Sequence, residues 1–354
     1  KKRVEDAFSH IAHINIEAET LLSDNKTTCY RNKAQYPVSF DRQLKIGFFA
    51  PRSHRVVDCE NCILQPPIFA DIVKIFRKFI IKNGITVYDS EKHTGLLRHI
   101  YLRLAEATGE VMVCAVINGE DLPHKNELIE KLTEIPSVKS IVLNINRDRT
   151  NVILGKECVT VWGSDCIYDV LCGVKVRLSP LSFYQVNHDM AQQLYEKAAE
   201  YACLSGKETV LDMYCGTGTI GLSMAKKAKR IIGAEIVPEA VLDAKRNALE
   251  NGIENAEFIC ADAGEAAQEL SSRGIKPDVV LLDPPRKGCS EMLLAEIVKM
   301  SPERIVYVSC DPSTLARDCS RLKDLGYETK RLAAADLFPR TVHVESVALL
   351  TKQK

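Results

Sequence analysis

The chain has 354 residues, and its 47 basic residues balance 47 acidic ones, which argues against a protein that coats nucleic acid with its whole surface. That length favours two or three domains of roughly 100–200 residues each, and no apolar run approaches the roughly 20 residues of a membrane helix. The 13 cysteines are scattered and odd in number, so we expect free thiols in a reducing cytoplasm rather than a disulfide framework.

Residues 1–22 are predicted to form a helix, because Val4, Phe8 and Ile11 recur at helical spacing. The opening sequence KKRVEDAFSH lacks the apolar segment of a signal peptide. Since the chain begins inside the helical pattern, we expect it to be a fragment whose natural N-terminus lies upstream.

Residues 25–57 form a basic segment rich in aromatic side chains. Its cations are Lys26, Arg31, Lys33, Arg42, Lys45, Arg52 and Arg55, its only acid is Asp41, and its rings are Tyr30, Tyr36, Phe40, Phe48 and Phe49. Alternation around a glycine over residues 44–48 predicts β-ribbons. Cations bind phosphates and rings stack on bases, so this segment is a candidate surface for single-stranded nucleic acid. A solvated sheet face with its rings in the core explains the same pattern equally well.

A lone C-x-x-C motif follows at Cys59 and Cys62. A structural zinc site normally needs a second pair, and none stands at a suitable spacing, so the motif is more typical of a structural role. Beyond it we predict helices over 66–80 and 124–134, and strands over 96–102, 111–117, 138–146, 151–154, 159–162, 167–171 and 174–178. This pattern indicates a sheet-rich α+β domain.

After a boundary at residues 179–187 and a helix over 190–203, strands and helices alternate regularly. The predicted strands are 208–213, 230–235, 256–261, 277–282 and 304–309, with a last one near 342–350. Such alternation predicts an α/β domain with a doubly wound, mainly parallel sheet.

The first of these strands leads into a glycine fingerprint of nucleotide-binding folds, Gly216-x-Gly218-x-x-Gly221. Glu235 ends the second strand, where a carboxylate accepts both ribose hydroxyls of an adenosine. Asp262 ends the third strand and is placed to reach the adenine amino group. These residues fit NAD as well as S-adenosylmethionine.

The fourth strand favours S-adenosylmethionine, because it leads into the turn Asp283-Pro284-Pro285. Such a turn presents carbonyl groups toward a planar substrate, as in methyltransferases that act on nucleobases, and hydride transfer has no known use for it. The alternative, a proline-rich surface turn, requires the strand assignment to be wrong.

The fifth strand ends at Cys310, directly before Asp311-Pro312, which are residues typical of a helix N-terminus. Ligands of open α/β sheets bind at the carboxyl ends of strands, and a helix N-terminus favours the thiolate and lowers the thiol pKa. Cys310 is therefore a candidate nucleophile. Taken alone, it is also consistent with a small, buried, inert cysteine.

With the segments VLDMYCGTGTIGL, LLDPPRKG, YVSCDPSTLARD and HVE, the sequence resembles the bacterial RNA (uracil-5-)-methyltransferases, and the likeness covers essentially the whole chain. The resemblance implies an S-adenosylmethionine-dependent enzyme that makes 5-methyluridine. It implies a helix at 1–25 that packs on the catalytic domain, a central RNA-binding domain at 26–178 and a Rossmann-like catalytic domain at 179–354. Carried over by motif, Gln185, Tyr214, Glu235 and Asp283 are cofactor-site residues together with Gly216, Gly218 and Asp262, while Cys310 is the nucleophile and Glu345 the base.

The chemistry explains why these residue types are needed. Carbon 5 of uracil is a poor nucleophile, and addition of the Cys310 thiolate at carbon 6 activates it. Glu345 then removes the carbon 5 proton, and burial should raise its pKa toward a useful range. If residues 342–345 alternate as a strand, His343 shares a face with Glu345 and either orients it or is a buried core histidine.

The substrate uridine must be unstacked from folded RNA before the nucleophile can reach it. We expect the flanking RNA backbone to be held by Arg31, Lys33, Arg52, Arg55, Arg286 and Lys287. The central domain and the position of Cys62 favour 23S rRNA over tRNA. The alternatives are a tRNA enzyme, an NAD-dependent oxidoreductase and a non-catalytic RNA-binding protein on a methyltransferase fold. We expect a cytoplasmic monomer with no obligate protein partner.

The sequence departs from the family in two respects. The small RNA-binding barrel that often precedes the fold is absent, and so are the first three cysteines of a C-x5-C-x2-C…C motif for a 4Fe–4S cluster. Cys62 occupies the fourth position. We therefore expect no metal and no assembled cluster in this chain, with Cys62 either a ligand left without partners or a plain thiol.

Overall fold

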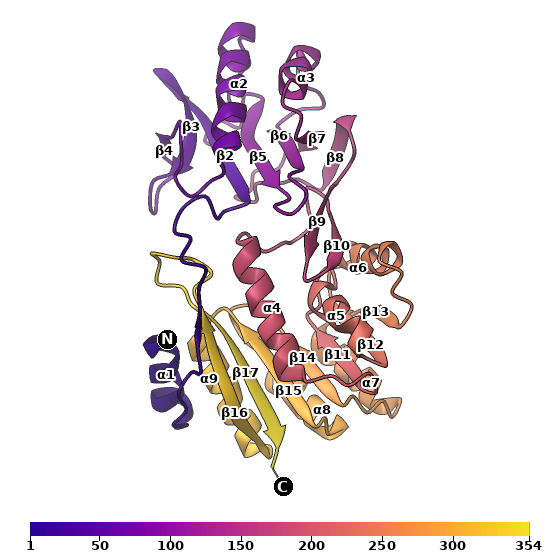
Figure 1. Cartoon of the computed structure of the whole chain (residues 1–354). Coiled ribbons are helices and arrows are strands. Elements are labelled where there is room, and N and C mark those ends of the chain that lie inside the picture. The colour runs from indigo at the N-terminus through magenta and orange to yellow at the C-terminus, as the bar shows by residue number, and fades with distance from the viewer. Residues whose placement is uncertain (354) are drawn as a thin grey trace. The chain divides into compact units, whose positions relative to one another are not determined.

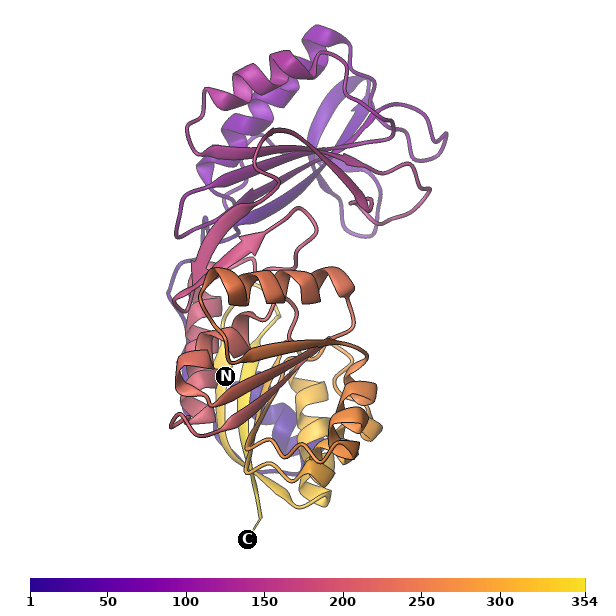
Figure 2. The same ribbon diagram turned by 90° about the vertical axis from the view of Figure 1, so that its right-hand side faces the viewer.

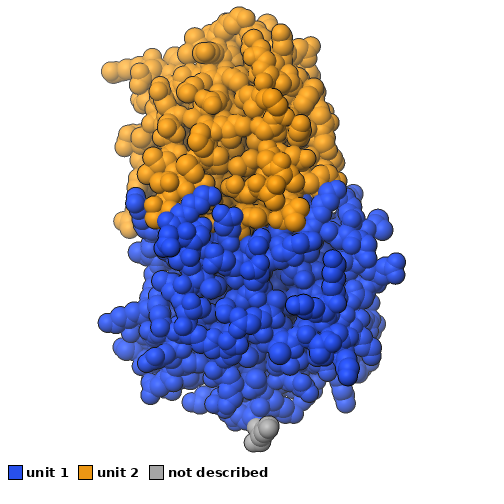
Figure 3. Space-filling model, viewed as in Figure 1, with its two compact units in different colours: residues 1–26, 171–176, 189–354 blue, residues 27–170, 177–188 orange. Residues whose placement is uncertain are grey.

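The computed structural model describes residues 1–353, which form two compact units with a sheet each (Figures 1 and 3). The first unit comprises residues 1–26, 171–176 and 189–354, and the second comprises residues 27–170 and 177–188. The hairpin of β9 (Ile167–Leu171) and β10 (Val174–Leu178) belongs to the second unit except for residues 171–176 around its turn, which belong to the first. Within the described residues, no helix is both long and apolar enough to cross a membrane.

The second unit is a mixed sheet with two helices on one face (Figure 1). Its strand order is β4-β3-β2-β5-β6-β7-β8, and every pair is antiparallel except β6 with β7. The strands are β2 (Lys33–Asp41), β3 (Gln43–Phe49), β4 (Val56–Asp58), β5 (Leu97–Leu104), β6 (Val111–Ile117), β7 (Val138–Ile145) and β8 (Glu157–Gly163), and the helices are α2 (Pro67–Asn83) and α3 (Lys125–Thr133). Phe69, Ile72 and Phe76 of α2 pack on the sheet because they recur at helical spacing.

The strand predicted over residues 151–154 is wrong, since this segment is an irregular loop. The Asn146 side-chain amide donates hydrogen bonds to the carbonyls of Val152 and Ile153, at 2.8 and 2.9 Å. A side chain that binds consecutive carbonyls in this way takes them from a strand ladder.

The first unit contains an eight-stranded, mainly parallel sheet in the order β1-β16-β17-β15-β14-β11-β12-β13, which confirms the predicted α/β fold. Its strands are β1 (Leu21–Leu22), β11 (Thr209–Met213), β12 (Arg230–Glu235), β13 (Ala256–Cys260), β14 (Val279–Leu282), β15 (Arg304–Ser309), β16 (Tyr327–Ala335) and β17 (Glu345–Lys352). Strand β17 runs antiparallel between β15 and β16. Strand β16 was not predicted, because its alanine-rich end favours a helix and only pairing on both sides makes it a strand.

Helices cover both faces of this sheet. They are α4 (His188–Ala202), α5 (Thr219–Met224) with a 3₁₀ turn at Ala225–Lys227, α6 (Pro238–Glu250), α7 (Ala263–Ser272), α8 (Glu291–Met300) and α9 (Pro312–Asp324). Helices α7, α8 and α9 share one face and its apolar core, and α4, α5 and α6 lie on the other face (Figure 2).

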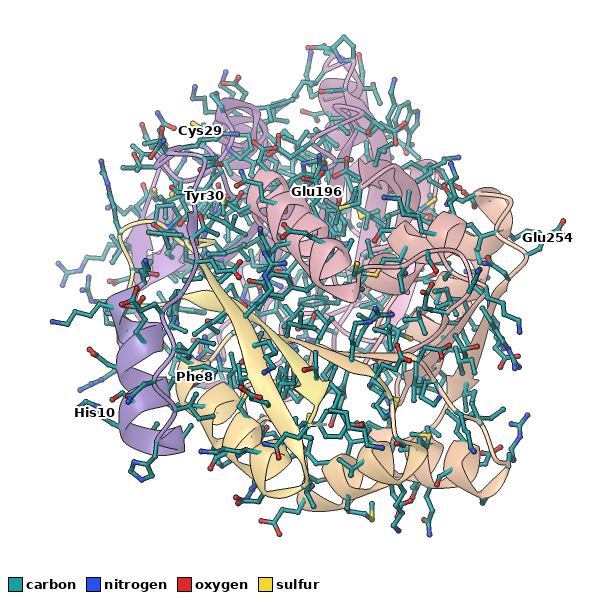
Figure 4. The ribbon with its side chains drawn as sticks, turned by 60° about the horizontal axis from the view of Figure 1, so that its bottom comes forward. Phe8, His10, Cys29, Tyr30, Glu196 and Glu254 are labelled. Atoms are coloured by element: carbon teal, nitrogen blue, oxygen red, sulfur yellow. The ribbon has the colours of Figure 1, made fainter. Side chains whose placement is uncertain are left out.

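The predicted N-terminal helix is shorter than expected. Helix α1 (Lys2–Ala7) continues as a π-helical turn at Phe8–Ala12 and ends where His13 adopts a left-handed conformation. Figure 4 shows Phe8 on the side of the helix that faces α9, whereas His10 points away. The later residues Leu21–Leu22, predicted as helix, instead pair with β16 at the edge of the sheet.

Candidate active site

The predicted site residues of the first unit follow parallel strands that end at the same edge of the sheet. Met213 of β11 pairs with Leu282 of β14, and Leu282 pairs with Tyr307 of β15, so these strands are in register. Their carboxyl ends are where an open α/β sheet binds its ligands. Tyr214, Asp283 and Cys310 therefore lie along one edge.

The antiparallel strand β17 brings Glu345 to the same edge. Ser309, the last residue of β15, pairs with Ser346 of β17. Cys310 follows Ser309 and Glu345 precedes Ser346, so the nucleophile and base candidates stand opposite each other at the end of the β15–β17 ladder. Residues 35 positions apart in sequence are thus brought together by strand pairing.

The glycine loop after β11 approaches its neighbours closely. Gly218 has φ +80°, and a Cβ there would lie 3.0 Å from the Phe258 ring. A Cβ on Gly221 would lie 2.7 Å from an Asp212 side-chain oxygen, so the third glycine allows tight packing, as predicted. The Gly216 amide donates a 3.1 Å hydrogen bond to Glu235, which fixes that carboxylate beside the loop.

Four carboxylates surround this edge of the sheet. Burial, with smaller contributions from the Asp283 and Glu235 charges, raises the pKa of Asp212 to about 7. Burial alone raises the pKa of Asp283 to about 7. Burial and then the Asp283 charge raise the pKa of Glu345 to about 8, so the expected direction for Glu345 is confirmed. A cationic ligand would offset the cost of charging these buried carboxyl groups, so the site favours one.

Asp212 is a residue that the sequence reasoning missed. One carboxylate oxygen accepts from the Gly221 amide at 3.0 Å, while the other is buried without a hydrogen-bond partner. A buried, unpartnered oxygen at a ligand-binding strand end needs a donor from outside the protein. A signal was present, since Asp212 is the one charged residue in the otherwise apolar strand 209–213.

Asp262 is the N-cap of α7 and accepts a 2.9 Å hydrogen bond from the Gly264 amide. This capping role accounts for an acid at that strand end without any ligand. Its predicted contact with adenine stays a prediction.

The expectation that the Cys310 pKa is lowered is wrong. Its thiol pKa is raised by burial first and then by the Glu345 and Asp283 charges, and the Arg286 charge offsets this only in part. The helix begins as predicted, with Asp311 as N-cap accepting from the Ser313 amide at 2.8 Å. That carboxylate occupies the first amides of α9, so they are not free to stabilise the thiolate.

Arg286 and Lys287, which are predicted to hold the RNA backbone, are both exposed in the loop after β14. The Arg286 charge also lowers the pKa of Cys310 and of Glu345. The contact of these two residues with RNA stays a prediction.

His343 does not share a strand face with Glu345, because β17 begins only at Glu345. The imidazole is exposed, so the interpretation as a buried core histidine is wrong. Its ring lies edge-on to Phe338, with centroids 6.1 Å apart.

The other predicted contact residues lie in the second unit. Gln185 accepts a 3.0 Å hydrogen bond from the Asn32 side-chain amide through its backbone carbonyl, and its role toward the cofactor stays a prediction. Burial, with the charges of Arg103 and Arg31, lowers the pKa of Lys33 to about 8. Arg52 and Arg55 are exposed in the loop between β3 and β4.

Some aromatic rings of the basic segment are in the core, as expected for a solvated sheet face, and others are exposed, as expected for a nucleic-acid surface. Tyr30 and Tyr36 are buried, whereas Phe40 and Phe49 have exposed fractions of 68% and 44%. Phe49 lies edge-on to His54, at 5.9 Å between centroids. Phe49 therefore lies next to the β3–β4 loop that carries Arg52 and Arg55, whereas Phe40 lies on β2 beside the other end of β3.

The C-x-x-C thiols are near each other, since burial and then the Cys62 thiol raise the pKa of Cys59. Within residues 1–353, no group of three or more His, Cys, Asp or Glu side chains is arranged to hold a metal ion.

The glycine loop, the acids at the strand ends and the antiparallel β17 define the class: the first unit has the Rossmann-like fold of the S-adenosylmethionine-dependent methyltransferases. Residues 172–353 match the family model described as tRNA (Uracil-5-)-methyltransferase. The chain belongs to the RNA (uracil-5-)-methyltransferase family and is an RNA methyltransferase.

Its relatives extend over nearly the whole chain. An uncharacterized RNA methyltransferase of Clostridium tetani is 46% identical over 353 residues, which are 99% of this chain and 77% of the relative. One from Halalkalibacterium halodurans is 46% identical over 354 residues, with the same coverage. The solved structure of Pyrococcus abyssi tRNA (uracil-54, C5)-methyltransferase in complex with S-adenosyl-L-homocysteine has a TM-score of 0.83 and 30% identity, covering 98% of this chain and 82% of that one.

Proposed function

We propose that this chain methylates carbon 5 of a specific uridine in RNA, with 23S rRNA as the substrate, through a covalent bond between Cys310 and carbon 6. The observation that supports it most is the ladder of β15 with β17, which sets Cys310 opposite Glu345. The charges of Asp283 and Arg286 act on both residues. A nucleophile and a base on one side of a planar ring are what this reaction requires.

S-adenosylmethionine is the cofactor, and the residues present fit it. Glu235 would accept the ribose hydroxyls, Gly216 and Gly218 leave room for close backbone approach, and Asp212 offers an unpartnered oxygen. When bound, the cofactor supplies an electrophilic methyl group on a cationic sulfur. The carboxylates complement that positive charge and would repel the pyrophosphate of NAD.

The chain's own residues perform the remaining chemistry. The Cys310 Sγ bonds to carbon 6 as the carbon 5–carbon 6 double bond opens, and the electron pair moves toward carbon 5 and oxygen 4. After carbon 5 is methylated, Glu345 accepts its proton. The electron pair of that C–H bond restores the double bond, the S–C bond breaks and Cys310 leaves as thiolate.

A second candidate substrate is tRNA. The likeness to the Pyrococcus abyssi tRNA enzyme covers 98% of this chain, including the second unit, so the presence of that unit alone does not favour rRNA. The position of Cys62 remains the argument for 23S rRNA.

The function is tested by incubating the chain with labelled S-adenosylmethionine and transcripts of 23S rRNA and of tRNA. We expect label in 5-methyluridine at one position of 23S rRNA, located by mass spectrometry of nuclease fragments, and no binding of NAD. If only tRNA is labelled, tRNA rather than 23S rRNA is the substrate. If the chain binds the cofactor but labels neither RNA, the proposed activity is contradicted.

The exposed arginines of the β3–β4 loop are proposed to hold the RNA backbone. Replacing Arg52 and Arg55 with alanine should weaken RNA binding and reduce the slope of log affinity against log salt by roughly one per lost phosphate contact. Fluorescence anisotropy at several salt concentrations measures both. Lys78→Ala is the matched control, because Lys78 is exposed on α2 of the same unit. An unchanged slope in the double variant would remove this loop from the RNA surface.

A further inference from the structure

A buried carboxylate outside the proposed chemistry joins three segments of the first unit. Asp318, in the second turn of α9, is fully buried. One of its oxygens accepts from the Tyr307 hydroxyl and from the Cys289 amide, both at 2.8 Å. Tyr307 belongs to β15, and Cys289 ends the loop that follows β14. Asp318 therefore ties that loop and β15 to the helix that begins beside Cys310.

Arg317 makes a second connection between the same helix and loop. Its guanidinium contacts the other Asp318 oxygen, with Nε at 2.9 Å and Nη2 at 2.8 Å. The same Nη2 donates a 2.9 Å hydrogen bond to the Lys287 carbonyl. An arginine fork can make these bonds together because its donors are held in one plane, which a lysine ammonium cannot reproduce.

The loop lies so close to α9 that only glycine fits at position 288. Gly288 has φ +73°, and a Cβ there would lie 2.5 Å from both the Arg317 Nη2 and an Asp318 oxygen. The Cys289 side chain next to it is buried in the same apolar core as Tyr307, and Tyr214, directly after the cofactor strand β11, packs against that core.

This arrangement fixes the distance between two parts of the site that come from different elements. The loop at 283–289 begins with Asp283 and carries Arg286, whose charges act on Cys310 and Glu345. Cys310 stands at the start of α9. Asp318 lies six residues beyond Pro312, the first residue of α9, which is about 9 Å along the axis at 1.5 Å per residue.

We propose that Asp318 and Arg317 are positioning residues that clamp the 283–289 loop to α9 and so hold Arg286 and Asp283 at Cys310. The inference rests on the proposed function, because it assigns these residues a task in the Cys310 reaction. If the clamp opens, Asp283 and Arg286 are no longer held in place in the site, and carbon 6 is attacked more slowly although the substrates still bind.

The test compares Arg317→Lys, Gly288→Ala and Asp318→Asn with wild type. The first loses the fork, the second pushes the loop away from α9, and the third replaces two acceptor oxygens with one acceptor and a donor. Arg321→Gln is the matched control, because Arg321 reaches Asp318 only at 3.4 Å and binds Glu291 at 2.6 Å instead of the loop.

Iodoacetamide alkylation of Cys310 is measured against pH by mass spectrometry of the tryptic peptide 305–317, which holds no other cysteine. We expect the alkylation midpoint of the three clamp variants to move to lower pH, because the thiol loses the Asp283 charge, which raises its pKa by more than the Arg286 charge lowers it. We expect kcat to fall about tenfold or more with KM for RNA unchanged, since small misplacements of reacting groups cost that much. Arg321→Gln should match wild type in both.

An unshifted alkylation midpoint in Arg317→Lys and Gly288→Ala overturns the clamp, even where the melting temperature falls, because stability alone does not alter the thiol. These two variants decide the question if Asp318→Asn does not fold. The alkylation measurement needs neither RNA nor cofactor. A wild type that methylates no RNA would therefore remove the proposed function without deciding the clamp.

Discussion

Replacing Cys310 with alanine should abolish formation of 5-methyluridine, with a loss of roughly 10⁴-fold or more, as expected for removal of a covalent nucleophile. The Cys310 thiol can add to carbon 6 and later leave as thiolate, and it stands opposite the proposed base at the end of the β15–β17 ladder. Cys310→Ser should be nearly as inactive, because a hydroxyl beside the Glu345 and Asp283 charges ionises far less readily than a thiol.

Transcripts that contain 5-fluorouridine allow the covalent bond to Cys310 to be detected directly. Fluorine on carbon 5 cannot be removed as a proton is, so wild type should accumulate an RNA–protein adduct that survives a denaturing gel. The adduct should vanish in Cys310→Ala and persist in Cys203→Ala, a control at an exposed cysteine of the same unit. A normal methylation rate in Cys310→Ala would exclude the covalent mechanism.

The parallel part of the catalytic sheet could be predicted because its strands are short apolar runs between amphipathic helices. Strand β12 over 230–235 and β15 over 304–309 have the predicted bounds. Their ends then place Glu235 and Cys310 by topology alone. Strand β16 escaped prediction because no alternation marks its alanine-rich end, and its pairing with β17 depends on residues far along the chain.

The electrostatics of the site could not be predicted from local sequence. The helix start after Cys310 suggested a lowered pKa, and that local feature is present. The thiol pKa is raised instead by burial first and then by the charges of Glu345 and Asp283, which are 35 and 27 positions away and approach the thiol only in the folded sheet. Asp318 is similar: its motif STLARD supported the resemblance, but its contacts with Tyr307 and Cys289 require the packed structure.

Replacing Glu345 with glutamine should leave the first bond-forming step possible and block the last one. Glutamine has nearly the same shape but cannot accept the carbon 5 proton, so turnover should fall roughly 10²- to 10⁴-fold. With ordinary uridine and S-adenosylmethionine, the methylated RNA should remain attached to Cys310. A denaturing gel reports this trapped product, and Glu328→Gln, at an exposed acid on the neighbouring strand β16, is the matched control.

The pH dependence tests the same assignment independently. A carboxylate works as a base only when deprotonated, and the Glu345 pKa lies near 8 because the side chain is buried beside Asp283. Product release should therefore accelerate as pH rises through about 8 and slow as pH falls below it. This step can be measured alone if the adduct is formed first and then transferred to a series of pH values. Thiolate formation at Cys310, which its raised pKa also makes more complete at high pH, has already taken place in that adduct. Glu345→Gln should release product slowly at every pH. Free turnover in that variant, with the wild-type pH profile, would mean that another group removes the proton.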